Sequence, residues 1–283
     1  MLPIDNILLP SGLYIVSTPI GNLKDITIRA LTILKNSNYI ACEDTRITKK
    51  LLSAYEIKSK NLISMHDHSP QKKILTLIKK IKDGNSVSLV SDAGTPIISD
   101  PGYEIINLAI KNNITISPIP GPSAVTCSIP VSGLPSDKFF FIGFLPNKAN
   151  KRKNLINKLK ENDSLLIFYE SANRINQTIS EIYSVFGNRK CFIARELTKY
   201  YETFYRGDLL KFKNMKKKLK GEITVLIAPK EKKINLESFN DEIEKIISLT
   251  KQKLSTKDLS ELLSIIYKKP KKFFYSKLIK SIR

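Results

Sequence analysis

Short apolar segments alternate with amphipathic ones along the first 120 residues, and this alternation restricts the possible folds more than any other feature of the chain. The apolar segments have the length of buried strands and lie at 13–17, 39–42, 62–65, 87–91 and 114–119. The segments between them have apolar residues at helical spacing and lie at 25–35, 48–55, 71–82 and 104–111. Strands that alternate with helices predict a parallel sheet, and therefore an α/β domain.

The alternation pauses at 131–135, where the sequence reads V-S-G-L-P, and resumes at 139. Strands are then predicted at 139–143, 164–169, 190–194 and 221–228, with helices at 151–160 and 175–186. A lysine-rich segment at 229–235 precedes three further predicted helices, at about 238–250, 256–267 and 273–282, the second with Ser255 at its N-terminus as a cap. We therefore predict an N-terminal α/β domain over 1–125, a C-terminal α/β domain over 126–230 and a small basic helical tail over 231–283.

Three of the loops that follow predicted strands share an unusual composition of glycine, proline and small polar residues. They read T-P-I-G-N at 18–22, S-D-A-G-T-P at 91–96 and P-I-P-G-P-S-A at 118–124. The carboxyl ends of parallel strands meet at one edge of a sheet, where open α/β sheets bind ligands. Glycine lets the backbone approach a ligand closely, and proline lowers the entropic cost of ordering a loop. The sequence therefore predicts a preformed pocket at this edge.

Several well-known motifs are missing from these loops. The chain has no G-x-x-x-x-G-K-[ST], no G-x-G-x-x-G after the first strand and no G-x-S-x-G. These absences argue against a P-loop nucleotide triphosphatase, a Rossmann dinucleotide site and an α/β-hydrolase.

The basic charge of the chain is concentrated in its second half. The formal net charge is +21, to which residues 1–125 contribute +4, residues 126–230 contribute +11 and residues 231–283 contribute +6. A basic surface attracts phosphates and favours nucleic-acid binding. Lysines outnumber arginines 39 to 8, so a compositional bias toward lysine is an alternative explanation.

The cysteines and histidines indicate no metal site. Cys42, Cys127 and Cys191 are far apart within apolar segments, as expected of buried free thiols in a reducing cytoplasm. The two histidines, His66 and His68, lie together in a segment that we interpret as an exposed loop. No apolar run approaches the length of a membrane span, and the N-terminus lacks the pattern of a signal peptide, so we expect a cytoplasmic protein.

Six motifs occur in an order that carries a family resemblance. They read TPIGNL (18–23), CEDTR (42–46), VSDAGTPIISDPGY (90–103), PIPGPSA (118–124), FYES (168–171) and RELTK (195–199). Together they closely resemble the ribosomal RNA small subunit 2′-O-ribose cytidine methyltransferase family, which belongs to the tetrapyrrole-methylase superfamily. The resemblance extends from about residue 12 to the end of the chain, and departs from the family pattern at Ala172 and Asn173, where Pro-His is usual.

The resemblance implies two α/β domains of tetrapyrrole-methylase type, with S-adenosylmethionine bound in the cleft between them. It also implies a homodimer, and a substrate cytidine in the decoding region of 16S rRNA, with the assembled 30S subunit as our preferred partner. The cofactor-binding residues that it implies are Pro19, Gly21, Gly94, Thr95, Pro96, Ser99, Ser123, Ala124, Ile223 and Thr224.

Methyl transfer to a ribose hydroxyl needs a group that accepts the hydroxyl proton. Carboxylates at or just after predicted strand ends are the candidates, with Asp100 and Glu196 preferred; the set is Glu43, Asp44, Asp100, Glu170 and Glu196. Each has a structural alternative as a helix cap or as the partner of an arginine. The candidate RNA contacts are the basic residues of the same motifs, Arg46, Arg174, Arg195 and Lys199.

Two other functions remain open from the sequence. A methylase of a corrin or porphyrin precursor would share the pocket but act on an acidic tetrapyrrole. A non-catalytic RNA-binding protein would have kept the fold without the reaction.

Overall fold

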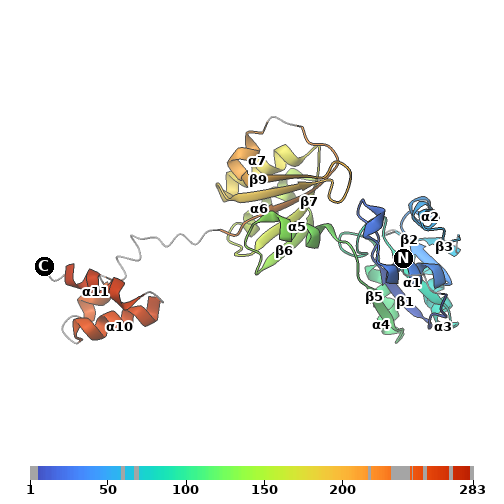
Figure 1. The fold of residues 1–283 in the computed structure, drawn as a ribbon, viewed down its shortest axis with the longest axis horizontal. Coiled ribbons are helices and arrows are strands. Elements are labelled where there is room, and N and C mark those ends of the chain that lie inside the picture. Colours follow the sequence, from blue (N-terminus) through green and yellow to red (C-terminus); the bar gives the residue numbers. More distant parts are fainter. Residues whose placement is uncertain are drawn as a thin grey trace. The chain divides into compact units, whose positions relative to one another are not determined.

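A computed structural model of the chain describes residues 6–58, 61–66, 70–215, 218–230, 243, 245–250, 254–267 and 270–280, with the backbone alone at 277 and 280. The chain divides into two compact units, residues 1–230 and residues 231–283 (Figure 1). The larger unit contains two five-stranded sheets, and the smaller one contains helices.

The first sheet is fully parallel, as the alternating pattern predicts. Its strand order is β3-β2-β4-β1-β5, and each neighbouring pair is parallel. The strands are β1 (Gly12–Val16), β2 (Tyr39–Cys42), β3 (Asn61–Ser64), β4 (Ser86–Val90) and β5 (Ile116–Ile119). The helices are η1 (Leu23–Asp25), α1 (Ile28–Asn36), α2 (Thr45–Ala54), α3 (Gln71–Lys82) and α4 (Tyr103–Lys111).

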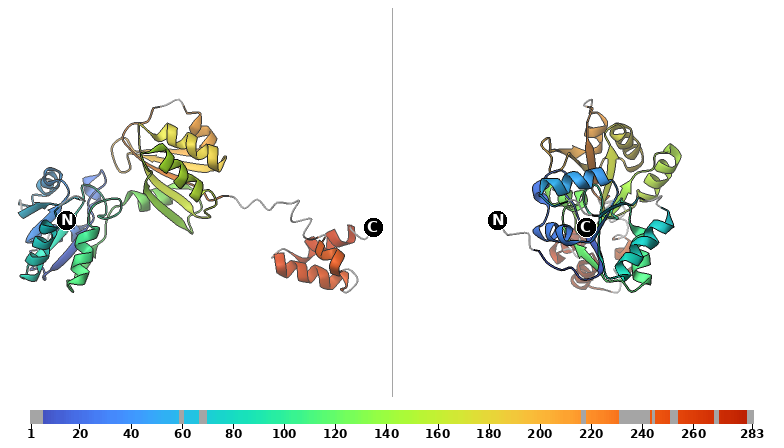
Figure 2. Two further views of the ribbon diagram at one scale, coloured as in Figure 1. Left: turned by 180° about the vertical axis from the view of Figure 1, so that it is seen from behind. Right: turned by 90° about the vertical axis from the view of Figure 1, so that its right-hand side faces the viewer.

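Helices cover both faces of this sheet. Leu34 of α1 and Leu52 of α2 are buried in one apolar cluster, whereas Leu77 of α3 and Ile105 of α4 are buried in another. The blue and the teal helices accordingly lie on opposite sides of the strands (Figure 2). A sheet covered on both faces leaves the loops at its strand ends as the place where a ligand can reach it.

The second sheet is mixed. Its order is β6-β7-β10-β8-β9, and only the pair of β6 and β7 is parallel. The strands are β6 (Phe139–Phe144), β7 (Leu165–Ser171), β8 (Lys190–Arg195), β9 (Thr203–Asp208) and β10 (Glu222–Ile227). The helices are α5 (Ala124–Ser132), α6 (Ala149–Leu159), α7 (Ile175–Phe186) and α8 (Leu209–Lys213).

The two faces of the second sheet pack against different helices. Ile156 of α6, Ile179 of α7 and Leu209 of α8 share one cluster with the strands. On the other face, Val125 of α5 is buried against Ile167 and other strand residues. Helix α5, strand β9 and helix α8 were not among the predicted elements. Helix α5 thus begins where the first sheet ends and contributes to the core of the second.

The smaller unit has an apolar core of its own. Leu259 and Leu263 of α10 (Thr256–Tyr267) pack with Phe274 and Leu278 of α11 (Lys271–Lys280). The Ser255 hydroxyl accepts a hydrogen bond from the backbone N–H of Asp258 at 3.1 Å, as the predicted cap requires. Of the helix predicted at 238–250, only 243 and 245–250 are described, and they are helical; 281–282 of the last predicted helix lie outside the described residues. Among the described residues, no helix is long and apolar enough to cross a membrane.

Candidate active site

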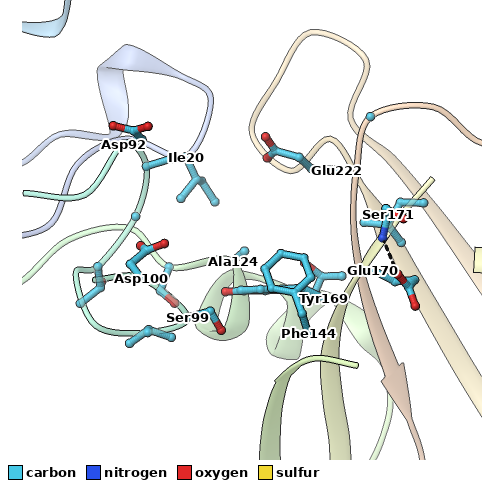
Figure 3. A pocket seen from close by; sticks show the side chains of 18 of the residues that line it. Ile20, Asp92, Ser99, Asp100, Ala124, Phe144, Tyr169, Glu170, Ser171 and Glu222 are labelled. Atoms are coloured by element: carbon cyan, nitrogen blue, oxygen red, sulfur yellow. Dashed lines mark hydrogen bonds between the residues drawn. The ribbon is translucent and has the colours of Figure 1, made fainter. Parts of the chain in front are cut away.

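A cavity of about 500 Å³ in the larger unit lies at the loops that the sequence singles out (Figure 3). That size is ordinary for a small-molecule site. Residues that follow β1, β2, β4 and β5 form one wall, and residues of β6, β7 and β10 form the other. The candidate residues that line it are Gly94, Thr95, Ser99, Asp100, Ser123, Ala124, Glu170, Ile223 and Thr224, together with Glu43.

The three glycine- and proline-containing loops are joined to one another by hydrogen bonds. Thr18 and Gly94 form an isolated bridge, with the Thr18 N–H donating to the Gly94 carbonyl at 2.8 Å and the Gly94 N–H donating to the Thr18 carbonyl at 3.0 Å. The Thr95 hydroxyl is 3.0 Å from the Ser17 hydroxyl and donates to the Pro122 carbonyl at 3.1 Å. The loops therefore form one preorganised wall rather than three independent turns.

Unusual backbone conformations occur in the central loop. Ile97 has a φ of 77°, and the cavity-lining Ser99 has a φ of 69°. The left-handed region is unfavourable for residues with a Cβ, and most of all for a β-branched residue such as isoleucine. Such strain persists only where surrounding contacts enforce it, and it tends to occur at functional sites.

Tyr169 of β7 is a cavity residue that sequence reasoning did not identify. Its ring contacts Phe141 and Phe144 edge-on, with centroid distances of 5.0 and 5.4 Å. Its hydroxyl is hydrogen-bonded to the Ser123 side chain and to the backbone of Val125. Burial, and next the negative charge of Asp100, raise the pKa of Tyr169 to about 12. The phenol therefore stays neutral and connects β7 to the start of α5. Its position within the F-Y-E-S motif was the available signal.

The cavity is acidic. Its lining includes the carboxylates of Asp92, Asp100 and Glu222, and none of its lining residues is lysine, arginine or histidine. Figure 3 shows Asp100 and Glu222 extending from opposite walls. Within the described residues, no group of three or more histidines, cysteines, aspartates and glutamates is arranged to hold a metal ion; 67 and 68, beside His66, lie outside that part of the chain. An acidic cavity favours a cationic ligand.

Glu170 lines the cavity, but its carboxylate takes part in a buried network. Its Oε1 accepts hydrogen bonds from the Ser171 N–H at 2.7 Å and from the Arg174 Nε at 2.8 Å, and its Oε2 accepts one from the Thr178 hydroxyl at 2.7 Å. Arg174 also donates to the Asn147 side chain and to the Leu145 carbonyl. These contacts give both side chains a structural role in the second domain.

Glu196 and Lys199 lie beside the cavity rather than among its lining residues. The Glu196 Oε1 accepts from the Glu222 N–H at 2.8 Å and from the Lys199 Nζ at 3.1 Å, and the Lys199 Nζ is 3.0 Å from the Glu222 Oε2. Burial acts to raise the pKa of Glu196, but the hydrogen bonds from Glu222 and Lys199 outweigh it, so the pKa lies below its usual value. The pair thus holds Glu222 in the cavity wall.

The loop that carries Glu196 also contacts the first domain. The Asn22 N–H donates to the Thr198 hydroxyl at 3.1 Å, and a Cβ added to Gly21 would collide with the Lys199 side chain. Gly21 therefore has a packing role next to the cavity. Neither it nor Pro19 and Pro96 line the cavity.

The remaining candidates have exposed or structural contacts. Asp44 caps α2 and forms a 2.6 Å ion pair with Arg46, whose side chain is 85% exposed. Hydrogen bonds from Arg46 lower the pKa of Asp44 to about 2. Arg195 donates to the carbonyls of Lys220 and Tyr201. The structure thus assembles most of the predicted cofactor residues in one cavity and leaves the basic candidates outside it.

Comparisons with known proteins agree with this architecture. Residues 12–212 match the family model for tetrapyrrole (corrin/porphyrin) methylases. Among solved structures, uroporphyrin-III C-methyl transferase from Thermus thermophilus complexed with S-adenyl homocysteine is similar, with a TM-score of 0.54 and 13% identity. The match covers 77% of this chain and 97% of that one, and at this identity it supports the fold alone.

Curated relatives are much more similar in sequence. The ribosomal RNA small subunit methyltransferase I of Rickettsia prowazekii (strain Madrid E) is 44% identical over 281 residues, which cover 97% of each protein. The protein of the same name from Thermotoga maritima is 45% identical over 221 residues, which cover 77% of this chain and 99% of the relative. This chain therefore belongs to the ribosomal RNA small subunit methyltransferase I family, within the tetrapyrrole methylases.

Proposed function

We propose that this chain is an S-adenosylmethionine-dependent methyltransferase that methylates the ribose 2′-hydroxyl of a cytidine in the decoding region of 16S rRNA. The observation that supports it most is the acidic, preorganised cavity between the two sheets, in a chain whose relatives are named as methyltransferases of small-subunit rRNA.

The cavity suits the cofactor in charge and in shape. A sulfonium cation is favoured by the lining carboxylates of Asp92 and Asp100, whereas Glu222 is paired with Lys199. At Gly94, a Cβ would come within 3.3 Å of the Ile20 side chain, so glycine keeps the backbone open to a ligand. The proposed contacts are the loops at Gly94 and Ser123 and the apolar Ile223 opposite. When bound, the cofactor supplies a methyl carbon that its positive sulfur makes electrophilic.

Asp100 is the proposed proton acceptor. Of the candidate carboxylates, Glu43, Asp100 and Glu170 line the cavity, whereas Asp44 and Glu196 do not. Asp100 lines the cavity and lies near enough to the neutral Tyr169 phenol to affect its pKa. A carboxylate there can accept the proton of a ribose hydroxyl while the loops align that oxygen with the methyl carbon.

The acidic cavity disfavours the alternative substrate. Corrin and porphyrin precursors carry several carboxylates, which the lining carboxylates of Asp92 and Asp100 would repel. RNA differs because only one ribose has to enter, while its phosphates remain near exposed basic residues such as Arg46. The strain in the central loop at Ile97 and Ser99 argues against a binding protein that has lost its reaction.

Transfer of a tritiated methyl group distinguishes these functions. Labelled S-adenosylmethionine is supplied with 30S subunits, with naked 16S rRNA and with a uroporphyrinogen-type substrate. We expect label in 30S subunits, and after alkaline hydrolysis in a resistant dinucleotide, because 2′-O-methylation blocks cleavage of the adjacent phosphodiester. Label in ordinary mononucleotides, or in the tetrapyrrole, would refute the proposal.

Asp100→Asn tests the assignment of the proton acceptor. The rate of methyl transfer at saturating substrates should fall about a hundredfold or more, with cofactor affinity largely kept. Asp163→Asn is the matched control, because this carboxylate is 60% exposed and pairs with Lys138. A loss of less than about tenfold would exclude Asp100 as the base.

The proposal extends to the substrate particle, the RNA-binding region and the oligomeric state. The assembled 30S subunit is the proposed substrate, the basic second half the proposed RNA-binding region, and a homodimer the proposed active species. Sedimentation of the protein alone measures its oligomeric state, and sedimentation with 30S subunits measures its binding to them.

A further inference from the structure

Two adjacent tyrosines are exposed next to the cavity wall. Tyr200 and Tyr201 have 93% and 67% of their surface exposed, so neither belongs to a core. Their rings meet at 89° with centroids 5.0 Å apart. Large aromatic side chains usually bury most of their surface, so an exposed aromatic pair is a candidate contact surface.

The loop that carries this pair is held in one conformation. The Tyr201 carbonyl accepts hydrogen bonds from the Arg195 Nη1 at 3.1 Å and from the Thr203 hydroxyl at 2.9 Å. The Thr198 N–H donates to the Glu202 side chain at 2.7 Å, which closes the loop on both sides of the tyrosines. The rings are therefore presented on an ordered backbone, so that a partner does not have to order it.

The segment of chain that carries the pair is basic in sequence. Between Arg195 and Lys220 the sequence holds nine lysines and arginines against three acidic residues. The loop also adjoins the proposed active site, because Lys199, next to Tyr200, forms an ion pair with the cavity-lining Glu222. Exposed aromatic rings among cations are the pattern of single-stranded nucleic-acid binding, in which bases stack on the rings and cations contact phosphates.

We propose that Tyr200 and Tyr201 form a stacking platform for unpaired bases that flank the methylated nucleotide. This assignment rests on the proposed function, because it takes the substrate to be RNA. A nucleotide whose ribose enters the cavity must leave the helical stack, and its neighbours then lose stacking partners. The platform replaces that stacking at the edge of the cavity.

The charge favours RNA over a second copy of the chain as the occupant. Two copies that met at this loop would bring two basic segments together, and their like charges would repel each other. A polyanion such as RNA would instead be attracted to the segment. Obligate protein interfaces are larger and more apolar than such a pair.

The test compares three variants of the full-length protein. The first, Tyr200→Ala with Tyr201→Ala, removes both rings. The second, Tyr200→Phe with Tyr201→Phe, keeps them, and Tyr103→Ala removes a tyrosine that is 71% exposed on α4. Binding of a single-stranded oligoribonucleotide that contains 2-aminopurine is followed by fluorescence, and methyl transfer to 30S subunits is measured as kcat and KM.

We expect the double alanine variant to bind the oligonucleotide about tenfold or more weakly, with an unchanged salt slope, because stacking is lost and phosphate contacts are kept. The KM for 30S subunits should rise similarly, while cofactor affinity and the two controls stay near wild type. Unchanged RNA binding by the double alanine variant would overturn the platform, and so would a change in its oligomeric state, since that would assign the rings to an interface between copies. Failure of the wild-type protein to methylate any RNA would instead refute the proposed function, and the fluorescence titration would still decide whether bases stack here.

Discussion

Replacing Arg174 by methionine should destabilise the larger unit severely, because it would leave a buried carboxylate without its counter-charge. The Glu170 side chain is 0% exposed, and Arg174 contacts it from Nη2 at 2.6 Å and from Nε at 2.8 Å. In the variant, only the Ser171 N–H and the Thr178 hydroxyl would remain as hydrogen-bond donors to that carboxylate.

The size of the effect follows from the burial. Breaking a buried ion pair by removing one partner costs about 3–5 kcal/mol, whereas replacing both partners is much less costly. For a unit of this size, each kcal/mol lowers Tm by roughly 2–4 °C, so we expect a fall of roughly 6–20 °C. Glu170→Gln combined with Arg174→Met should recover much of the loss, since no unpaired charge then remains.

Urea unfolding of the two single variants, the double variant and Arg46→Ala measures these differences as a double-mutant cycle with a surface control. The Arg46 variant should scarcely move the midpoint, because its pair with Asp44 is exposed to solvent. If Arg174→Met shifted the urea midpoint as little as Arg46→Ala does, the reasoning would be refuted. It would also leave Arg174 available for the RNA contact predicted from the sequence.

Three further predictions concern the cavity, its supporting loop and the tail. Gly94→Val should lower both stability and cofactor affinity, because Gly94 has a φ of 81° and lies beside the cavity-lining Ile20. The control Gly84→Val, at a φ of 91° and with no atom within 4 Å of an added Cβ, should lower stability alone. Calorimetric titration measures the affinities and thermal melts measure the stabilities. The pKa of Glu196 is lowered from 4.5 in the folded protein, so the ionised carboxylate stabilises the fold fully above pH 4.5. This stabilisation is lost as the pH falls through the folded-state pKa. The Tm values of wild type and Glu196→Gln, measured from pH 7 to pH 3, should therefore differ most at neutral pH and converge in acid. Deleting residues 231–283, which have an apolar core of their own, should leave cofactor affinity unchanged. The plot of log affinity for 30S subunits against log salt concentration should become shallower, because phosphate contacts are lost. An unchanged slope would mean that the tail contributes no phosphate contacts.

The features that the sequence predicts correctly are those with a local physical cause. Helix α3 was predicted with its observed limits, because apolar residues recur at helical spacing and Gly84 follows the end of the helix. The three pocket loops were recognisable because glycine and proline have specific backbone requirements, whatever they pack against. Their common location follows from the parallel sheet.

The features that were missed depend on distant contacts. Helix α5 has Thr126, Ser128 and Ser132 interspersed among its apolar residues and contains Pro130, so its sequence shows no helical periodicity. Its helical state is supported by packing against β10 and its neighbours, far along the chain. Tyr169 lies within a strand whose pattern indicates only burial, and it becomes a cavity residue because Ser123 and Val125 lie opposite.

The span of chain that builds the cavity has a consequence for its synthesis. The lining extends from Ile20 to Thr224, whereas the first sheet is complete at the end of β5, Ile119. At translation rates of about 5–20 residues per second, roughly 10–40 s separate the emergence of the first lining residue from that of the last. During that interval the first domain can fold while its three loops face solvent without their opposite wall. A nascent chain of this family thus acquires its site late, only after β10 has left the ribosome and inserted between β7 and β8.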